Sequence, residues 1–251
     1  MPKRAVKFAR AVLAAAFFAA FGLCGAVIGY VALPALALVP GTQRRGAIRR
    51  RLVKWSYRGF LAAARAVGLL RVEIDEDSRR ALANAKGCVI AANHITLIDV
   101  VVLIANLPDS TAIAKMGAAA NPFYGFIVKF AFIAGKDASR ILSRATDLLS
   151  EGVNVIVFPE GTRVAPDSKG RKLKRGAARS AMASGAKILP VFISCSERVL
   201  EKGQPFWEVG SGTIVWKVEA REPVDVSRLE GGRRGEIELM REISARIWPT
   251  S

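Results

Sequence analysis

The stretch CVIAANHITLID at residues 88–99 joins an apolar run to a polar loop and then to the start of a second apolar run. The first five residues, CVIAA, are typical of a buried strand, and residues 98–105 are typical of a short helix. A strand followed by a helix across a short loop is the repeating unit of α/β folds. This stretch therefore predicts the unit around which the rest of the domain is built.

The loop of this unit contains His94, the only histidine in the 251 residues. An imidazole titrates near neutral pH, so a single histidine is the first candidate for a proton-transfer group. Asp99 follows five residues later, an offset of about 140° on one continuous helix. Across a strand-to-helix corner, however, Asp99 can accept a hydrogen bond from one ring nitrogen and leave the other as a base. The alternative is a histidine in a turn and an aspartate that caps a helix. For a His and an Asp five residues apart without further motifs, this structural interpretation is the more common one.

A second polar motif follows another apolar run, VNVIVFPEGTR at residues 153–163. A buried strand that ends in an acid, a glycine, a hydroxyl and an arginine places polar groups at the carboxyl edge of a sheet, where open α/β sheets bind ligands. The guanidinium of Arg163 has the geometry to bind phosphate. The motif thus indicates an anion site, with an ordinary turn as the alternative.

The alternation of strands and helices continues from residue 72 to the end of the chain. It predicts an α/β domain with a central, largely parallel sheet flanked by helices. We expect Pro190 to interrupt its strand and residues 122–130 to form a helix or a loop. The expected strands are 72–74, 88–92, 111–115, 153–158, 188–194 and 213–218, and the expected helices are 78–85, 98–105, 138–151, 175–184 and 234–247.

The N-terminal part is different, because residues 11–39 contain no charged side chain. This run exceeds the roughly 20 residues that cross a bilayer, so residues 1–43 are predicted to be a membrane anchor, either one transmembrane helix or a re-entrant helical hairpin. A signal peptide is the alternative. Residues 44–71 are predicted to be a basic amphipathic helix at the interface, with Trp55 and Tyr57 at headgroup depth, or else packed on the domain. Residues 72–251 form the α/β domain.

The net charge of +17 is concentrated near the apolar segment. Residues 1–71 carry 13 of the 38 Lys and Arg and none of the 21 Asp and Glu. Such a cluster would face anionic lipid headgroups, and the more basic downstream flank is expected to be cytoplasmic. A nucleic-acid partner is disfavoured, because no nucleic-acid-binding motif is present. The three scattered cysteines indicate a reducing compartment and argue against a zinc site or a disulfide scaffold.

The two polar motifs together resemble the lysophospholipid acyltransferase family, of the 1-acyl-glycerol-3-phosphate acyltransferase type. Its signature, NHxxxxD followed by FPEGTR, appears here letter for letter, with 67 residues from His94 to Gly161. Residues 72–220 contain the further similarities, which are AK at 114–115, NPFYG at 121–125, KLKRG at 172–176 and ILPV at 188–191. One block departs from the family pattern GxxxIDR. It reads FIAGKD at 132–137, with Lys136 near the position of the arginine, and this leaves the acceptor open.

The resemblance implies a site and a mechanism. His94 would be the general base and Asp99 would fix its tautomer, with no metal and no bound cofactor. The acyl donor would be acyl-CoA or acyl-carrier protein. The residues expected to bind the acceptor headgroup are Glu160, Gly161, Thr162 and Arg163, with Lys115 and Lys136 as further candidates.

The implied function is transfer of a fatty acyl group to a lysophospholipid, most directly 1-acyl-glycerol-3-phosphate, giving phosphatidic acid. The implied location is the inner membrane of a bacterium, with the catalytic domain, residues 72–251, on the cytoplasmic side. One alternative is another acceptor, either a lyso-amino-acid lipid or a phospholipid under remodelling. Another is a non-catalytic membrane-binding scaffold, which the intact set of His94, Asp99, Glu160 and Arg163 argues against.

Overall fold

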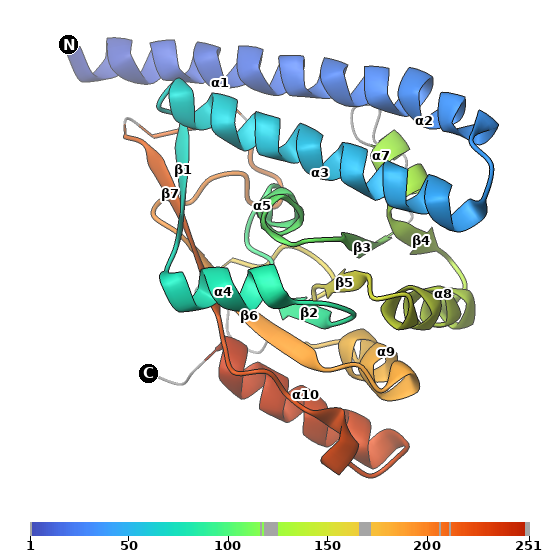
Figure 1. The fold of residues 1–251 in the computed structure, drawn as a ribbon. Coiled ribbons are helices and arrows are strands. Elements are labelled where there is room, and N and C mark those ends of the chain that lie inside the picture. Colours follow the sequence, from blue (N-terminus) through green and yellow to red (C-terminus); the bar gives the residue numbers. More distant parts are fainter. Residues whose placement is uncertain are drawn as a thin grey trace.

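A computed structural model of the chain describes residues 2–115, 117, 125–165, 172–205, 207–210 and 212–248, without the side chains of 2–4 and 126 (Figure 1). The α-helices are α1 (Pro2–Val27), α2 (Leu33–Ala35), α3 (Thr42–Ala66), α4 (Glu76–Asn84), α5 (Asp99–Asn106), α7 (Gly125–Ala131), α8 (Ala138–Ser150), α9 (Gly176–Ser184) and α10 (Arg233–Ile247). Shorter helical turns are η1 (Ile28–Ala32), η2 (Leu36–Leu38) and η3 (Val226–Arg228). The strands are β1 (Leu70–Ile74), β2 (Val89–Ala92), β3 (Ser110–Lys115), β4 (Ile133–Gly135), β5 (Asn154–Val157), β6 (Ile188–Cys195) and β7 (Ile214–Ala220).

The strands form one sheet in the order β1-β7-β6-β2-β5-β3-β4. Every neighbouring pair is parallel except β6 and β7, which run antiparallel. The predicted α/β fold with a largely parallel sheet is therefore confirmed. The prediction missed β4, whose three residues are too few to show a periodic pattern.

Pro190 does not interrupt its strand, so that expectation was wrong. β6 is continuous from Ile188 to Cys195, and the β6–β7 ladder begins at the pair Val191 and Ala220. Pro190 lies one residue before this ladder, where its carbonyl accepts a hydrogen bond from the Arg221 N–H at 2.9 Å. Pro190 contributes to the β6–β7 pairing only through its carbonyl, so the missing N–H of proline does not break the ladder.

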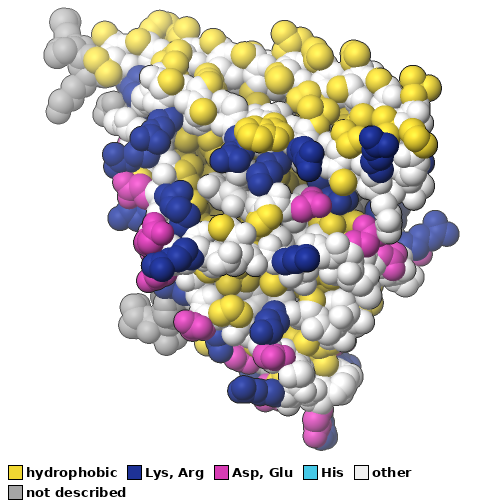
Figure 2. All heavy atoms as spheres, in the orientation of Figure 1, with side chains coloured by type: hydrophobic (Ala, Val, Ile, Leu, Met, Phe, Trp, Pro, Cys, Tyr) yellow, Lys and Arg dark blue, Asp and Glu magenta, His cyan; other side chains and the backbone are white. Residues whose placement is uncertain are grey.

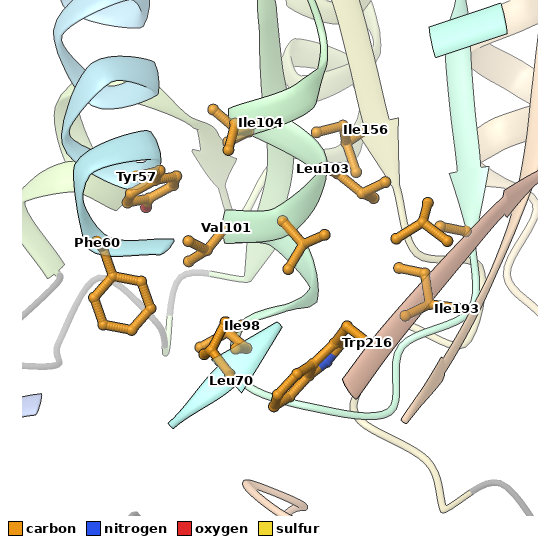
Figure 3. Close-up of a cluster of buried hydrophobic side chains, with 14 of the residues drawn as sticks. Tyr57, Phe60, Leu70, Ile98, Val101, Leu103, Ile104, Ile156, Ile193 and Trp216 are labelled. Atoms are coloured by element: carbon orange, nitrogen blue, oxygen red, sulfur yellow. The ribbon is translucent and has the colours of Figure 1, made fainter. Parts of the chain in front are cut away.

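The two faces of the sheet bury different helices, because successive strand residues point to opposite sides. In β2, Ile90 and Ala92 join the core under α3, α4 and α5, whereas Val89 and Ala91 join the core under α8, α9 and α10. Figure 3 shows the first core, where α3 contributes Tyr57 and Phe60, α5 contributes Val101 and Leu103, and β7 contributes the fully buried Trp216. This double burial explains why β2 reads as a continuous apolar run.

Two helices begin at an aspartate that accepts backbone hydrogen bonds. Asp75 caps α4 by accepting the Ser78 N–H at 2.8 Å, and Asp137 caps α8 by accepting the Ser139 N–H at 2.9 Å. The hydrogen bonds from Ser78 lower the pKa of Asp75, and those from Ser139 lower the pKa of Asp137. These caps therefore fix the first residue of α4 and the first residue of α8.

The apolar N-terminal segment lies alongside α3 (Figure 1). The ring of Phe21 is 4.2 Å from that of Phe60, and the ring of Phe17 is 5.1 Å from it. The π-helical turn η1 comes just before Pro34. This turn accommodates the proline, so the helical segment continues past it. Among the described residues, one helix, Ala5–Leu38, is long and apolar enough to cross a membrane.

The opposite side of this segment is apolar and exposed. Figure 2 shows hydrophobic side chains gathered along the edge formed by α1 and α2. In the N-terminal segment Phe8 is 73%, Leu23 68% and Val31 64% exposed. The helix predicted at 44–71 corresponds to α3, and its inner face packs on the domain. Trp55 is exposed, but Tyr57 is buried, so the expectation of Tyr57 at headgroup depth was wrong.

Shortening a fully buried side chain of α5 tests how much this core contributes to stability. Leu103 lies between α3 and the sheet and has no exposed surface (Figure 3). We expect Leu103→Ala to lower the free energy of unfolding by about 2–5 kcal/mol, because the deletion leaves a cavity in a packed interior. Urea denaturation measures this, with Leu38→Ala, at a side chain 88% exposed, as the matched control. Equal losses in the two variants would contradict the described core.

Candidate active site

His94 and Asp99 meet at the corner between β2 and α5. His94 lies in the loop and its side chain is 19% exposed, whereas Asp99 is the first residue of α5 and is completely buried. The Nδ1 atom of His94 is 2.9 Å from Oδ2 of Asp99. This pairing leaves Nε2 as the ring nitrogen for a second partner. The geometry is the one that the sequence predicted for a strand-to-helix corner.

The Asp99 carboxylate also binds the loop that precedes it. Its Oδ2 accepts the backbone N–H groups of Ile95 and Thr96, both at 2.7 Å, and its Oδ1 accepts the Thr96 hydroxyl. The Thr96 hydroxyl oxygen in turn accepts the indole N–H of Trp216 at 3.3 Å. A buried carboxylate needs such donors to offset the loss of water. These bonds fold the loop back toward His94. Asp99 is therefore not the N-cap of α5, a position that Ile98 occupies, and the alternative of a helix-capping aspartate was wrong.

The loop after β5 holds His94 from the other side. Glu160, which is 6% exposed, accepts the His94 backbone N–H at 2.7 Å, and the His94 carbonyl accepts the Val164 N–H at 2.8 Å. The ring of Phe158 stacks on the imidazole with 4.2 Å between ring centroids. The two sequence motifs therefore come together around one side chain. Glu160 was predicted to bind a headgroup, and in the structure one oxygen of this carboxylate holds the backbone of His94.

Gly161 is required at its position for two reasons. Its φ is +65°, and a Cβ atom there would lie 2.9 Å from Cε of Lys174. The backbone N–H of Lys174 donates to the Pro159 carbonyl at 2.7 Å, so the backbone of Lys174 is fixed over the turn while its side chain is exposed. The glycine thus allows the basic segment before α9 to pack closely on the second motif.

Alanine substitutions at Gly161 and Gly185 separate the effect of the positive φ from the effect of the contact with Lys174. Gly185 has nearly the same φ, +68°, but nothing lies within 4 Å of the Cβ that would be added. We expect Gly185→Ala to lose about 1–2 kcal/mol from backbone strain alone, and Gly161→Ala to lose slightly more, because the flexible end of the exposed Lys174 side chain must also move. Thermal melting compares the two variants. A smaller loss for Gly161→Ala than for Gly185→Ala would contradict this packing.

Arg163 connects the second motif to the loop after β6. Its Nη1 donates to the carbonyls of Leu200 at 2.8 Å and Glu201 at 3.1 Å. The Leu200 carbonyl also accepts the Leu97 N–H at 3.1 Å, and Leu200 has a φ of 55°, a left-handed conformation that is unusual for leucine. Arg163 therefore joins the loops that follow β2, β5 and β6, and part of its guanidinium is occupied by this role.

The other predicted site residues lie at the same edge of the sheet without a described contact to His94. Lys115 ends β3 and pairs with Gly135 of β4, so Lys136 follows directly at the next strand. Both lysines are exposed, and Thr162 is half-buried. Residues 121–124, which the family resemblance singled out, lie outside the described residues.

Cys195 ends β6 near this edge, so its thiol is a candidate nucleophile that has to be compared with the role of His94 as a base. Burial raises the pKa of its thiol to about 11, and the neighbouring Asp99 carboxylate adds to this effect. A thiol that stays protonated at neutral pH is a poor nucleophile. A mechanism that uses the Cys195 thiol as a nucleophile is therefore disfavoured, and the His94 imidazole remains the candidate catalytic group. Within the described residues, no group of three or more His, Cys, Asp and Glu side chains is arranged to hold a metal ion.

Three further residues shape the site and had no role in the sequence interpretation. Asn93 accepts the Ile193 N–H at 2.6 Å and donates to the Ile193 carbonyl at 2.7 Å, which locks the end of β2 to β6. Thr96 and Trp216 extend the hydrogen bonds of Asp99. Asn93 and Thr96 lie inside the first motif, where their polarity was a usable signal. Trp216 is 120 residues from Thr96, and nothing in the sequence pattern connects them.

Comparison with known proteins finds acyltransferases. A family model described as "Acyltransferase" matches residues 70–194, about half of the chain. The chain is 25% identical over 122 residues to "1-acyl-sn-glycerol-3-phosphate acyltransferase BAT2, chloroplastic" of Brassica napus, covering 46% of this chain and 35% of that protein. It is 26% identical over 121 residues to "1-acyl-sn-glycerol-3-phosphate acyltransferase LPAT1, chloroplastic" of Arabidopsis thaliana, covering 46% and 34%. The match thus spans about a third of the length of these plant relatives.

A solved structure resembles the whole chain. The crystal structure of the 1-acyl-sn-glycerophosphate (LPA) acyltransferase PlsC from Thermotoga maritima matches with a TM-score of 0.65 and 24% identity, covering 97% of this chain and 100% of that one. At this identity the likeness concerns the fold. Together, the family match, the plant relatives and the paired motifs around His94 show that the chain belongs to the acyltransferase family that includes the 1-acyl-sn-glycerol-3-phosphate acyltransferases.

Proposed function

We propose that this chain transfers a fatty acyl group from acyl-CoA or acyl-carrier protein to the hydroxyl of a lysophospholipid. The most direct acceptor is 1-acyl-glycerol-3-phosphate, with phosphatidic acid as the product. The observation that carries the proposal is the 2.9 Å pairing of His94 Nδ1 with the buried Asp99 carboxylate. The names of the two plant relatives give the acceptor, and they support the same acceptor for this chain.

The pairing suggests a direct transfer without an acyl-enzyme. Nε2 of His94 takes the proton of the acceptor hydroxyl as its oxygen attacks the thioester carbonyl, while Asp99 holds the Nδ1–H and stabilises the imidazolium. The tetrahedral intermediate then expels the thiolate of the donor, which takes the proton from the imidazolium. One ester bond forms and one thioester bond breaks, and His94 ends in the state in which it began.

The acceptor phosphate would bind beside this base at the carboxyl edge of the sheet. Lys115 and Lys136 supply exposed positive charge at the ends of β3 and β4, and Thr162 supplies a hydroxyl. Arg163 contributes to phosphate binding with the nitrogens that the Leu200 and Glu201 carbonyls leave open. Acyl-CoA and acyl-carrier protein are both anionic, so the positive net charge would attract either donor.

The N-terminal segment would hold this site at a membrane, which we propose is the inner membrane of a bacterium with the catalytic domain on the cytoplasmic side. The exposed apolar row of α1 and α2 supports membrane association (Figure 2). The inner face of α1 packs on α3, and α3 packs on the domain core. A helix fixed along the domain in this way favours an orientation along the membrane surface over a single transmembrane span, because a span would carry α3 into the bilayer. The continuous helix Ala5–Leu38 also leaves no turn for a re-entrant hairpin within residues 1–43.

Acyl transfer by the purified protein tests the proposal. A panel of lysophosphatidate, other lysophospholipids and a lyso-amino-acid lipid would be offered with acyl-CoA and with acyl-carrier protein, and products would be identified by mass spectrometry. We expect phosphatidic acid from lysophosphatidate. Transfer only to another lyso-lipid would favour the second candidate, which the presence of Lys136 in place of the family arginine keeps open. Binding of lipid without any transfer would favour the scaffold alternative.

A further inference from the structure

A cavity of 550 Å³ lies at the end of the sheet opposite to His94. It is lined by Ala37 of η2, by α3, by Thr111 near the start of β3, and by Ile133 at the start of β4. In parallel strands the starts and the ends lie at opposite edges of the sheet. His94 follows the end of β2, so this cavity is separate from the candidate active site. Its volume is in the range of known ligand pockets.

The walls of the cavity are strongly basic. Arg45, Arg49, Arg50 and Arg144 line it, and none of the acidic residues that the structure describes does. Asp109 lies outside the lining and neutralises Arg50 through two hydrogen bonds of 2.7 and 2.9 Å. Within the described part of the chain, Arg45 donates only to the neutral carbonyl of Ala37, at 3.3 Å. The cavity therefore has more positive charge than its protein neighbours compensate.

Arg49 has an unused donor inside the cavity wall. Its Nε atom is buried and has no hydrogen-bond partner among the described residues. Its guanidinium carbon lies 5.8 Å from the ring centre of Phe130, which also lines the cavity. A buried N–H of a charged group that lacks an acceptor is costly. An anion in the cavity would compensate the charge of Arg49, and phosphate suits the guanidinium fork.

The position of the cavity indicates where such an anion comes from. Ala37 lines the cavity, and the next residue, Leu38, is 88% exposed at the end of the apolar N-terminal segment. The cavity therefore lies directly beside the surface that would contact the bilayer. A lipid with its chains next to Leu38 can place its headgroup phosphate among the arginines, whereas a soluble phosphate gains nothing from the apolar surface.

We propose that this cavity binds the phosphate of an anionic membrane lipid, at a site distinct from the one that performs acyl transfer. Arg45 and Arg49 bind the phosphate from α3, and Arg144 approaches it from α8. Such a lipid fixes the turn between the N-terminal segment and α3 against the membrane. The proposal does not depend on the acyl-transfer reaction, because none of its residues lies at the carboxyl edge of the sheet.

Binding to vesicles tests this site with a matched pair of double variants. Arg45→Gln/Arg49→Gln removes two cavity charges and keeps side chains of similar length, and Arg44→Gln/Arg51→Gln removes two exposed charges from the same helix. Flotation would compare phosphatidylcholine vesicles with and without phosphatidylglycerol. We expect the cavity pair to weaken binding to the anionic vesicles by about tenfold or more, and the control pair by no more than about threefold. His94→Ala is expected to bind like the unmodified protein.

Other outcomes would overturn the proposal. Equal losses for the two pairs would mean that diffuse surface charge, not the cavity, attracts the membrane. If glycerol 3-phosphate or inorganic phosphate raises the melting temperature of the unmodified protein but not of the cavity pair, while vesicle binding is unchanged, the site takes a soluble phosphate instead. If the cavity pair fails to fold, Arg144→Gln at the exposed opposite wall replaces it. Unchanged binding in that variant would also overturn the proposal.

Discussion

Replacing His94 with alanine is expected to lower kcat for acyl transfer by about 10²–10⁴-fold, the usual contribution of a general base. The alanine has no Nε2 to take the hydroxyl proton and no Nδ1 to pair with Asp99. The fold should survive, because the bonds of Glu160 and Val164 are made to the backbone of residue 94, which the substitution keeps. The loss therefore reports on chemistry and not on unfolding.

The measurement is a steady-state assay with the acceptor found active in the panel, together with a melting curve. Cys195→Ala is the matched control, because it removes the candidate nucleophile at the same edge of the sheet. We expect it to keep most of the activity, since burial raises the pKa of that thiol to about 11. Full activity of His94→Ala, or loss of activity in Cys195→Ala alone, would refute the proposed base.

The second large effect is expected for Asp99→Asn, with a decrease in kcat of about 10²–10⁴-fold and a small change in stability. One amide oxygen can replace Oδ2 and still accept the N–H groups of Ile95 and Thr96 and the Nδ1–H of His94. The amide nitrogen can replace Oδ1, because the Thr96 hydroxyl can turn and accept a hydrogen bond. What the variant lacks is the negative charge that stabilises the imidazolium.

Asp99→Ala separates this electrostatic role from the structural one. Without any acceptor, the buried donors of Ile95 and Thr96 are left unpaired, at a cost of about 1–3 kcal/mol for each buried group. We expect Asp99→Ala to melt well below Asp99→Asn, while both have low kcat. A value of kcat near that of the unmodified protein for Asp99→Asn would show that the charge has no part in catalysis.

The local elements of this protein were predictable because each is encoded by residues close in sequence. The apolar run before Asn93 specified β2, and the run before Phe158 specified β5, since strands buried on both faces need continuous apolar residues. The corner between β2 and α5 brought His94 and Asp99 together as expected, because only a few residues of backbone separate them. The family-specific motifs at both corners predicted where the candidate site lies.

The remaining parts of the site depend on residues that meet only in the folded sheet. Glu160 also holds the backbone of His94, a contact that was not predicted, because β5 pairs directly with β2. The contacts of Asn93 with Ile193 and of Thr96 with Trp216 span 100 and 120 residues. Such pairings follow from strand order and register, and no periodicity within one segment encodes them.

The N-terminal segment illustrates the same division. Its length and lack of charge were sufficient to predict an apolar helix, because hydropathy is a property of each residue alone. The sequence did not predict the packing of Phe17 and Phe21 on α3. It also did not predict the arginine-lined cavity at the turn between the N-terminal segment and α3. The sequence by itself determined the elements, the two motifs and the apolar segment. Only the tertiary structure decided which groups face one another, since those contacts join segments that are distant along the chain.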